Sequence, residues 1–139
     1  MATKALADRF DHIVLTVNSI EETITFYERV LGFEKEIFQG SDDQPRYALR
    51  FGRQKINLQN RATDTANKAY APTFGSADFC LVAAVPLNQV LGHLRAENIP
   101  IIGPVSRNGA MGSMRSVYFR DPDRNLVEVS EYVTETNSK

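Results

Sequence analysis

Hydrophobic and polar positions in the first 60 residues change from a strand period to a helix period and back. Residues 10–17 alternate between an apolar row and a row that contains His12, which is typical of a strand with one buried face. Ser19 begins a predicted helix, because Glu22 completes a capping box and apolar residues then recur at helical spacing. Gly32 is a natural helix end. Three extended segments follow, at residues 33–39, 46–51 and 55–59.

The same order of elements is predicted again after a polar connection at residues 60–75. Residues 77–83 alternate like a strand, and Pro86 suits the first turn of a helix with apolar residues at helical spacing. Residues 99–105 are extended, and the Gly-rich residues 106–113 are predicted to form a loop. The chain then shows strand, turn and strand over residues 115–132, with the turn at 121–125.

This internal repetition predicts the architecture. Each half has the order strand, helix, strand, strand, strand, and such repetition is strong evidence for a repeated fold. The fold class is therefore α+β, with two tandem βαβββ modules that form a curled mixed sheet. We expect one domain at residues 9–133, with module one at 9–60, module two at 76–133 and a frayed polar tail at 134–139.

Composition excludes several classes of partner. The 139-residue chain has a formal net charge of −1, which gives no electrostatic reason to bind nucleic acid or an anionic membrane. Residues 1–9 lack an apolar targeting region, and no stretch approaches the roughly 20 apolar residues of a membrane helix. A cytosolic location is expected. The one cysteine, Cys80, lies in an apolar strand pattern and is predicted to be a buried, inert thiol.

Four polar residues interrupt the apolar strands at places that match between the halves. They are His12 and Asp78 in the two first strands, and Gln59 and Glu128 in the two last strands. Each alone is more simply a strand-face polar residue or, for His12, a satisfied interior histidine. If the apolar rows face the helices, all four project from the other side of the sheets. One imidazole, one amide and two carboxylates could then form a metal shell.

These features resemble a known family. The paired modules, His12 in the first strand, and the segment Tyr-Phe-Arg-Asp-Pro-Asp-Arg-Asn-Leu-Val-Glu-Val at 118–129 resemble the vicinal oxygen chelate superfamily. That superfamily includes glyoxalase I, extradiol dioxygenases, fosfomycin-resistance transferases and bleomycin-resistance proteins. The segments Asp-His-Ile-Val-Leu-Thr-Val and Phe-Gly-Arg-Gln-Lys-Ile-Asn-Leu are similar to the glyoxalase-domain-containing protein 5 subgroup, which includes virulence-associated bacterial proteins. The resemblance spans residues 9–132.

The resemblance implies a divalent metal on the concave face, at His12, Gln59, Asp78 and Glu128. Bacterial glyoxalase I has Glu at the place of Gln59 and His at the place of Asp78. One imidazole with oxygen donors is a harder shell, which favours Mn²⁺, Mg²⁺ or Ni²⁺ over tetrahedral Zn²⁺, or a site that holds no metal. The expected activity is that of a lyase or isomerase on a small oxygenated metabolite, with Glu128 as the base. A homodimer is expected, with the site within one chain or between two.

Two other functions are open. A non-catalytic binder of the bleomycin-resistance type would use the same cavity without metal. The residues predicted to line the substrate pocket in either case are Tyr47, Phe51, Arg107, Met111 and Tyr118, although core packing is the simpler interpretation of Phe51. The 106–113 loop is either a lid or a hairpin connection. An oxygen-dependent dioxygenase is the third possibility, against which the missing second histidine counts.

Overall fold

The computed structural model describes residues 4–63 and 67–134, and it contains two βαβββ modules. Module one consists of β1 (His12–Thr16), α1 (Ile20–Leu31), β2 (Glu34–Gln39), β3 (Pro45–Phe51) and β4 (Gln54–Gln59). Module two consists of β5 (Asp78–Val82), α2 (Leu87–Ala96), β6 (Ile102–Gly109), β7 (Gly112–Arg120) and β8 (Leu126–Tyr132). The predicted repetition is confirmed. Most of the predicted tail, residues 135–139, lies outside the described residues.

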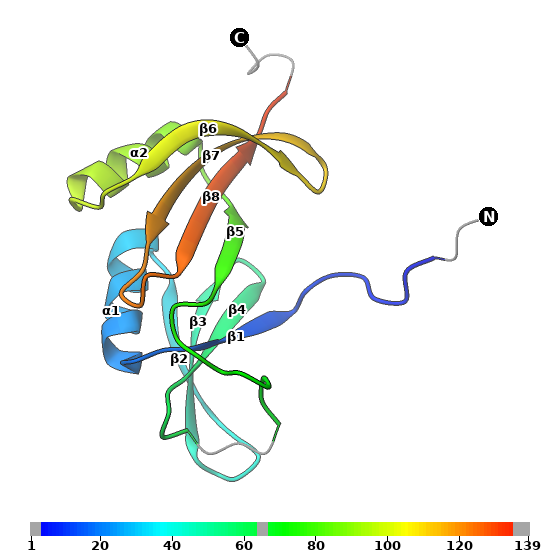
Figure 1. The fold of residues 1–139 in the computed structure, drawn as a ribbon, viewed down its shortest axis with the longest axis vertical. Helices are drawn as coiled ribbons and strands as arrows, with labels where there is room; N and C mark the ends of the chain where they lie inside the picture. The colour runs from blue at the N-terminus through cyan, green and yellow to red at the C-terminus, as the bar shows by residue number, and fades with distance from the viewer. Residues whose placement is uncertain (1–3, 64–66, 135–139) are drawn as a thin grey trace.

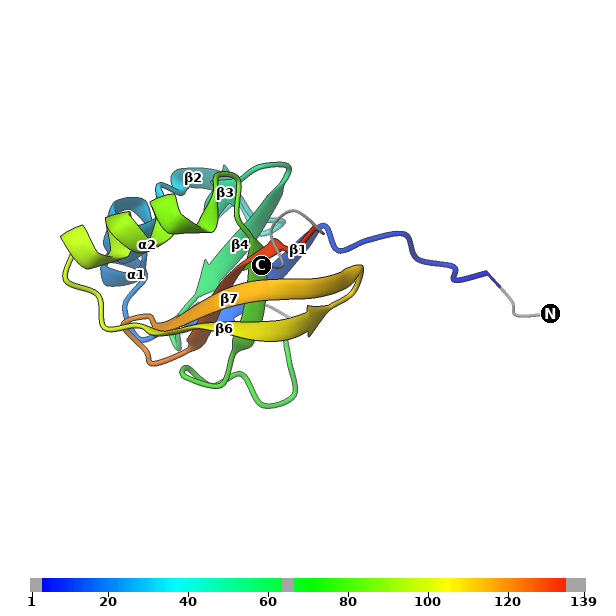
Figure 2. The same cartoon turned by 90° about the horizontal axis from the view of Figure 1, so that it is seen from above.

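Each module forms its own four-stranded mixed sheet (Figure 1). The strand orders are β1-β4-β3-β2 and β5-β8-β7-β6, so the same topology occurs twice. The first strand of each module pairs in parallel with the last, and the remaining pairs are antiparallel. In both Figure 1 and Figure 2, α1 and α2 lie next to each other on one side of the molecule.

Local chemistry explains the bounds of α1. The Ser19 hydroxyl accepts a hydrogen bond from the Glu22 N–H at 3.1 Å, which satisfies one free donor of the first turn. Gly32 ends the helix in the left-handed region, at φ 70°, where a residue without a Cβ is favoured. Between these ends, Ile24, Tyr27 and Val30 face the core. Full burial of such a side chain stabilises the fold by about 1.5–3 kcal/mol.

One continuous core joins the two modules. It contains inward rows of both sheets together with residues of both helices, among them Leu15, Leu49, Ile56, Leu91, Leu94, Val117, Val127 and Val129. Polar contacts add to this packing: the Arg29 guanidinium of α1 pairs with Glu97 at 2.9 Å, and the Arg29 carbonyl accepts a hydrogen bond from His93 Nε2 of α2. The prediction that His93 lies on the second helix, away from the strand positions, is confirmed. The face of each sheet that points away from this core is called the outer face below.

The structure corrects the prediction of a loop at residues 106–113. These residues belong to β6 and β7, which form a hairpin joined by Ala110 and Met111. The reason is local: Gly112 adopts φ 133°, which permits a tight two-residue turn, and Gly109 pairs with Gly112 across it. Glycine therefore marks the turn and not an extended loop, so these residues give no support for a lid.

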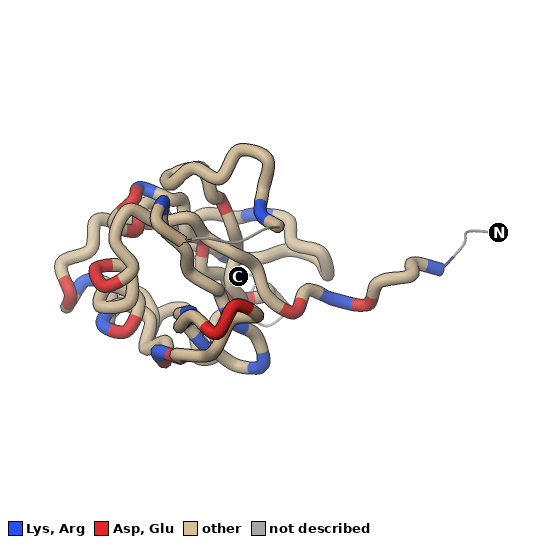
Figure 3. The backbone as a smooth tube through the Cα atoms, turned by 90° about the horizontal axis from the view of Figure 1, so that it is seen from below, with Lys and Arg blue, Asp and Glu red and all other residues tan. Residues whose placement is uncertain are grey.

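Charge is spread over the molecule without a large area of one sign (Figure 3). Acidic and basic residues follow one another closely along the tube, and several form ion pairs, such as Arg46 with Asp42. Within the described residues, no helix has the length and apolar character needed to cross a membrane.

Candidate functional site

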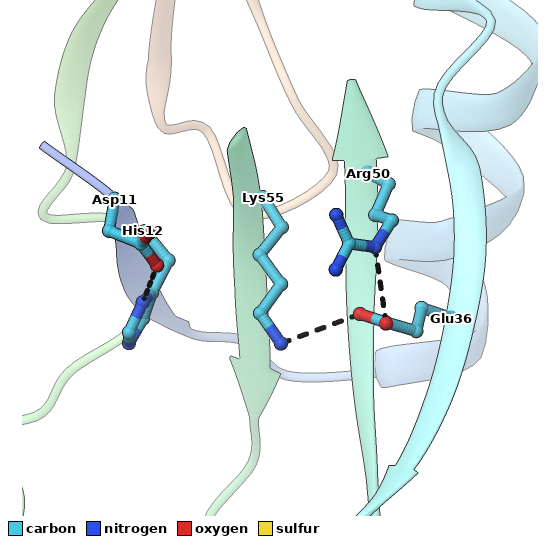
Figure 4. Close-up of polar contacts among 5 residues, drawn as sticks. All are labelled: Asp11, His12, Glu36, Arg50 and Lys55. Atoms are coloured by element: carbon cyan, nitrogen blue, oxygen red, sulfur yellow. Dashed lines mark hydrogen bonds and ion pairs between the residues drawn. The ribbon is translucent and has the colours of Figure 1, made fainter. Parts of the chain in front are cut away.

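His12 lies at the start of β1, on the outer face of sheet one, with its side chain 44% exposed. Its Nδ1 is 2.8 Å from Asp11 Oδ2, and Figure 4 marks this contact with a dashed line. A carboxylate can only accept, so Nδ1 carries the proton and Nε2 is the ring nitrogen that remains to bind a ligand. The same hydrogen bond is the main reason that the pKa of Asp11 is lowered. A carboxylate that orients an imidazole in this way is the arrangement found behind metal-bound histidines.

The cations beside His12 are neutralised by their own partners. Lys55 lies opposite His12 in the register, and its Nζ is 3.4 Å from Glu36 and 4.0 Å from the centre of the Phe38 ring. Arg50 Nε donates to the other Glu36 oxygen at 3.1 Å (Figure 4). Burial raises the pKa of Glu36, but the hydrogen bonds and charges of Arg50 and Lys55 outweigh it and lower that pKa. A carboxylate with two cations is not available as a metal ligand or base.

Strand register changes the predicted match between the two last strands. His12 lies opposite Lys55, and Asp78 lies opposite Leu126. When these two pairs are superimposed, the counterpart of Glu128 is Asn57, two residues after Lys55. Gln59 is instead the counterpart of Ser130.

The contacts of these two amides agree with that assignment. Gln59 Nε2 donates to the Thr16 hydroxyl at 2.9 Å, so this amide is used within its own sheet. Asn57 Oδ1 is buried and has no hydrogen-bond partner among the described residues. An unpaired buried oxygen costs about 1–3 kcal/mol, and an amide oxygen of this kind fits the oxygen donors that a divalent cation takes. The match of Gln59 with Glu128 is therefore corrected, and Asn57 takes its place.

Glu128 on β8 is held by a short chain of hydroxyl groups. The Ser130 hydroxyl donates to Glu128 Oε2 at 3.0 Å, and this uses the only proton that the hydroxyl has. The Ser116 hydroxyl, 2.6 Å from Ser130 Oγ, must then be the donor to it. Ser116 and Ser130 are fully buried, so the chain fixes one Glu128 oxygen.

Cys80 belongs to the same group, and this corrects the prediction of a buried thiol. It is exposed on the outer face of sheet two, opposite Glu128 in the register. Its Sγ lies 3.3 Å from Ser130 Oγ and 3.9 Å from the Leu81 carbonyl oxygen. Desolvation is the largest cause of the raised pKa of Cys80. The Ser130 hydroxyl lowers that pKa somewhat, and the Glu128 charge raises it. A thiol kept protonated in this way is a poor nucleophile.

The other predicted site residues divide between the two faces. Asp78, at the start of β5, is exposed and shares the row of Cys80. Tyr118 lies opposite Glu128 and accepts a hydrogen bond from Arg107 Nε at 2.8 Å. Met111 is 85% exposed at the hairpin tip.

Tyr47 does not lie with this group, whereas Phe51 lines a cavity together with His12 and Cys80. Tyr47 pairs with the buried Leu58, and both aromatic residues pack against the core from the inner face of sheet one. Phe51 also stacks on Phe33, with ring centroids 4.3 Å apart. Phe51 therefore packs against the core, the simpler interpretation, and also lines that cavity, whereas Tyr47 packs against the core.

The site residues are divided between two sheets within one chain. His12 and Asn57 lie on sheet one, whereas Asp78 and Glu128 lie on sheet two. Within residues 4–63 and 67–134, no three His, Cys, Asp or Glu side chains gather closely enough to hold a metal ion. The donor types suit a divalent cation, but a single chain does not assemble them.

Comparisons with known proteins identify the family. Residues 9–129 match the Glyoxalase/Bleomycin resistance protein/Dioxygenase superfamily, and the chain belongs to it. The fold, which is that of the vicinal oxygen chelate proteins, agrees with this membership.

Individual relatives place the chain within that superfamily. It is 49% identical over 129 residues to virulence protein STM3117 of Salmonella typhimurium, covering 92% of this chain and 87% of that protein. The crystal structure of STM3117 matches with a TM-score of 0.84 at 47% identity, over 93% of this chain and all of that one (100%). The chain is 42% identical over 123 residues to the glyoxalase domain-containing protein RDO1 of Mycosarcoma maydis. The match covers 88% of this chain and 67% of that protein. A lactoylglutathione lyase from Agrobacterium tumefaciens has the same fold, with a TM-score of 0.65 at 24% identity over 91% and 96% of the chains.

Proposed function

We propose that this protein is a divalent-metal-dependent lyase or isomerase for a small oxygenated metabolite. The observation that carries the proposal is the matched placement of His12 with Asn57, and of Asp78 with Glu128, on the outer faces of two sheets with the same topology. Superfamily membership agrees with it, because the superfamily is named for glyoxalase and dioxygenase members.

The metal site is proposed to be shared between two copies of the chain. One chain separates the two donor pairs onto different sheets, and its described side chains form no metal group. A homodimer in which sheet one of each copy faces sheet two of the other would bring an imidazole, an amide oxygen and two carboxylates together. Oxygen donors with one imidazole suit Mn²⁺, Mg²⁺ or Ni²⁺.

His12, Asp78 and Glu128, with Asn57 in place of Gln59, would hold the ion. The bound ion would supply a Lewis acid that polarises substrate oxygens and stabilises negative charge on them. Asp11 keeps the His12 ring in the orientation that exposes Nε2. Ser130 holds one oxygen of Glu128, and the other oxygen is the best placed group on this face to accept a proton from a substrate carbon. Gln59 cannot titrate and serves only its own sheet.

Mixed dimers test the shared site. His12→Ala and Glu128→Gln are each expected to abolish stoichiometric Mn²⁺ or Ni²⁺ binding, measured by elemental analysis after loading and desalting. A dimer with one chain of each variant, isolated with two affinity tags, should regain one site in two, because one interface then has both wild-type donor sets. If the site lay within one chain, the mixed dimer would bind no metal. Wild-type protein that binds no metal would refute the proposal and leave the non-catalytic binder.

That non-catalytic binder is the second candidate. The observation that favours it is the same lack of a three-residue metal group within the described part of one chain. It predicts that removal of metal with a chelator leaves ligand affinity unchanged, whereas the enzyme predicts loss of turnover.

A further inference from the structure

Arg107 is a positioned cation without an acidic partner. Its Nε donates to the Tyr118 hydroxyl at 2.8 Å, and its Nη1 donates to the Ser106 carbonyl at 2.8 Å. Its guanidinium carbon lies 5.3 Å from the centre of the Tyr118 ring. No ion pair to Arg107 occurs in the described residues, although Arg29, Arg46, Arg50 and Arg115 each have one. Neutral contacts therefore hold the group in one place and leave its charge uncompensated.

The remaining donors are available to a ligand. A guanidinium has five N–H groups, and two of them are used by Tyr118 and Ser106. The Tyr118 oxygen accepts from Arg107, so its own proton can be donated elsewhere. Planar N–H groups beside a hydroxyl match the two oxygens of a carboxylate.

The position of this pair connects it with the proposed site. Tyr118 lies directly opposite Glu128 across the β7–β8 pairing, and Glu128 lies opposite Cys80 on β5. Side chains of paired residues project from the same face of a sheet. Tyr118 therefore lies on the strand next to Glu128, the proposed base, and Arg107 contacts Tyr118.

We propose that the Arg107–Tyr118 pair is a carboxylate-binding subsite, and that the substrate is a small 2-oxo or 2-hydroxy acid or another metabolite with a carboxylate next to its reacting oxygens. This inference rests on the proposed function for the placement of the reacting atoms beside Glu128. The pair itself does not depend on metal. An arginine that merely covers a tyrosine ring would not discriminate between an acid and its neutral amide.

Sodium lactate and lactamide are the probes, because they have the same shape and differ in charge. Each is titrated into chelator-treated wild-type protein at constant ionic strength, and the backbone amide shifts of Arg107 and Tyr118 are followed by NMR. Lactate should saturate these shifts, and lactamide should bind at least tenfold more weakly. Arg107→Gln should weaken lactate binding about tenfold or more and leave lactamide unchanged. Tyr118→Phe should weaken lactate binding several-fold.

The matched control is Arg95→Gln, which removes the same charge from an exposed position on α2. It should bind lactate like the wild type, which separates local recognition from a change in net charge. Arg107→Lys keeps the charge without the fork of N–H groups and should fall between wild type and Arg107→Gln. Equal binding of lactate and lactamide, no lactate binding, or equal loss in both glutamine variants would each overturn the proposal. Because no metal is present, failure here is separate from failure of the mixed-dimer experiment.

Discussion

The buried hydroxyl of Tyr27 donates a 2.8 Å hydrogen bond to Oδ2 of Asp121, and this contact joins α1 of module one to the β7–β8 turn of module two. The same carboxylate also accepts from the Asp123 and Asn125 backbone N–H groups and from the Asn125 side chain. Burial, followed by the charge of Asp121, raises the pKa of Tyr27, so the phenol stays a donor. One aspartate therefore organises the turn and fixes the two modules to each other.

Tyr27→Phe should lower the free energy of unfolding by about 1.5–3 kcal/mol, the usual contribution of a hydrogen bond to a charged group. The ring keeps its packing, so the loss reports the hydroxyl alone. Urea unfolding measures it. Tyr70→Phe is the control, because Tyr70 is fully exposed and should change stability by less than 0.5 kcal/mol. An equal, small change in both variants would show that the contact does not hold the modules together.

Glu128→Gln should lower the pKa of Cys80. The Glu128 charge disfavours the thiolate beside it, and glutamine removes that charge without removing bulk. Since Cys80 is the only cysteine, alkylation by iodoacetamide reports on it alone. The pH midpoint of the alkylation rate should shift down in Glu128→Gln and stay in place in Glu131→Gln, which lies on the same strand but binds the Leu87 N–H and Arg115. A midpoint unchanged in both would contradict the arrangement around Ser130.

The sequence predicted the fold because its periods agree with the packing. The alternation around Ile13 and Leu15, the capping residues Ser19 and Gly32, and the turn at 121–125 are local signals, and local structure follows them. Residues 106–113 were predicted to form a loop and instead form a hairpin, because glycine is compatible with both a loop and a two-residue turn. Periodicity does not separate the two.

The site was harder to predict because it depends on register, which is a relation between strands that are distant in sequence. Sequence alone made Gln59 the counterpart of Glu128 in the other module, whereas strand register makes Asn57 that counterpart. A signal was present: Ile56-Asn57-Leu58 repeats the apolar, polar, apolar order of Val127-Glu128-Val129. Tyr47 was predicted to line the pocket, but it packs against the core, since an aromatic residue suits either place.

Asp123→Asn should remove a pH-dependent destabilisation. Burial is the main reason that the pKa of Asp123 is raised from 3.8. The Asn18 N–H partly offsets it, and the charges of Asp121 and Glu22 add to it. A raised carboxyl pKa means that the folded state binds the proton more tightly than the unfolded state. This group therefore destabilises the fold above its folded pKa, and the effect disappears as the pH falls below about 3.8.

The raised pKa of Asp123 determines how the stability of Asp123→Asn should differ from that of the wild type. At pH 7, Asp123→Asn should be as stable as wild type or slightly more stable, since the asparagine oxygen can still accept from Asn18. The advantage should shrink as the pH is lowered towards 3.8. Urea unfolding at several pH values measures the difference, in which the effects of other carboxylates cancel. An advantage that grows on acidification would contradict the sign.

Asn57→Leu should separate stability from binding. The buried Asn57 oxygen has no partner in the described part of the chain, so an apolar side chain of similar size relieves a desolvation cost of about 1–3 kcal/mol. We expect equal or higher stability in urea without metal, together with loss of Mn²⁺ or Ni²⁺ binding by elemental analysis. Gln59→Leu, which instead breaks a hydrogen bond to Thr16, should lose about 0.5–1.5 kcal/mol and retain the metal. The reverse pattern, with metal lost only in Gln59→Leu, would restore Gln59 as the ligand and refute the assignment from strand register.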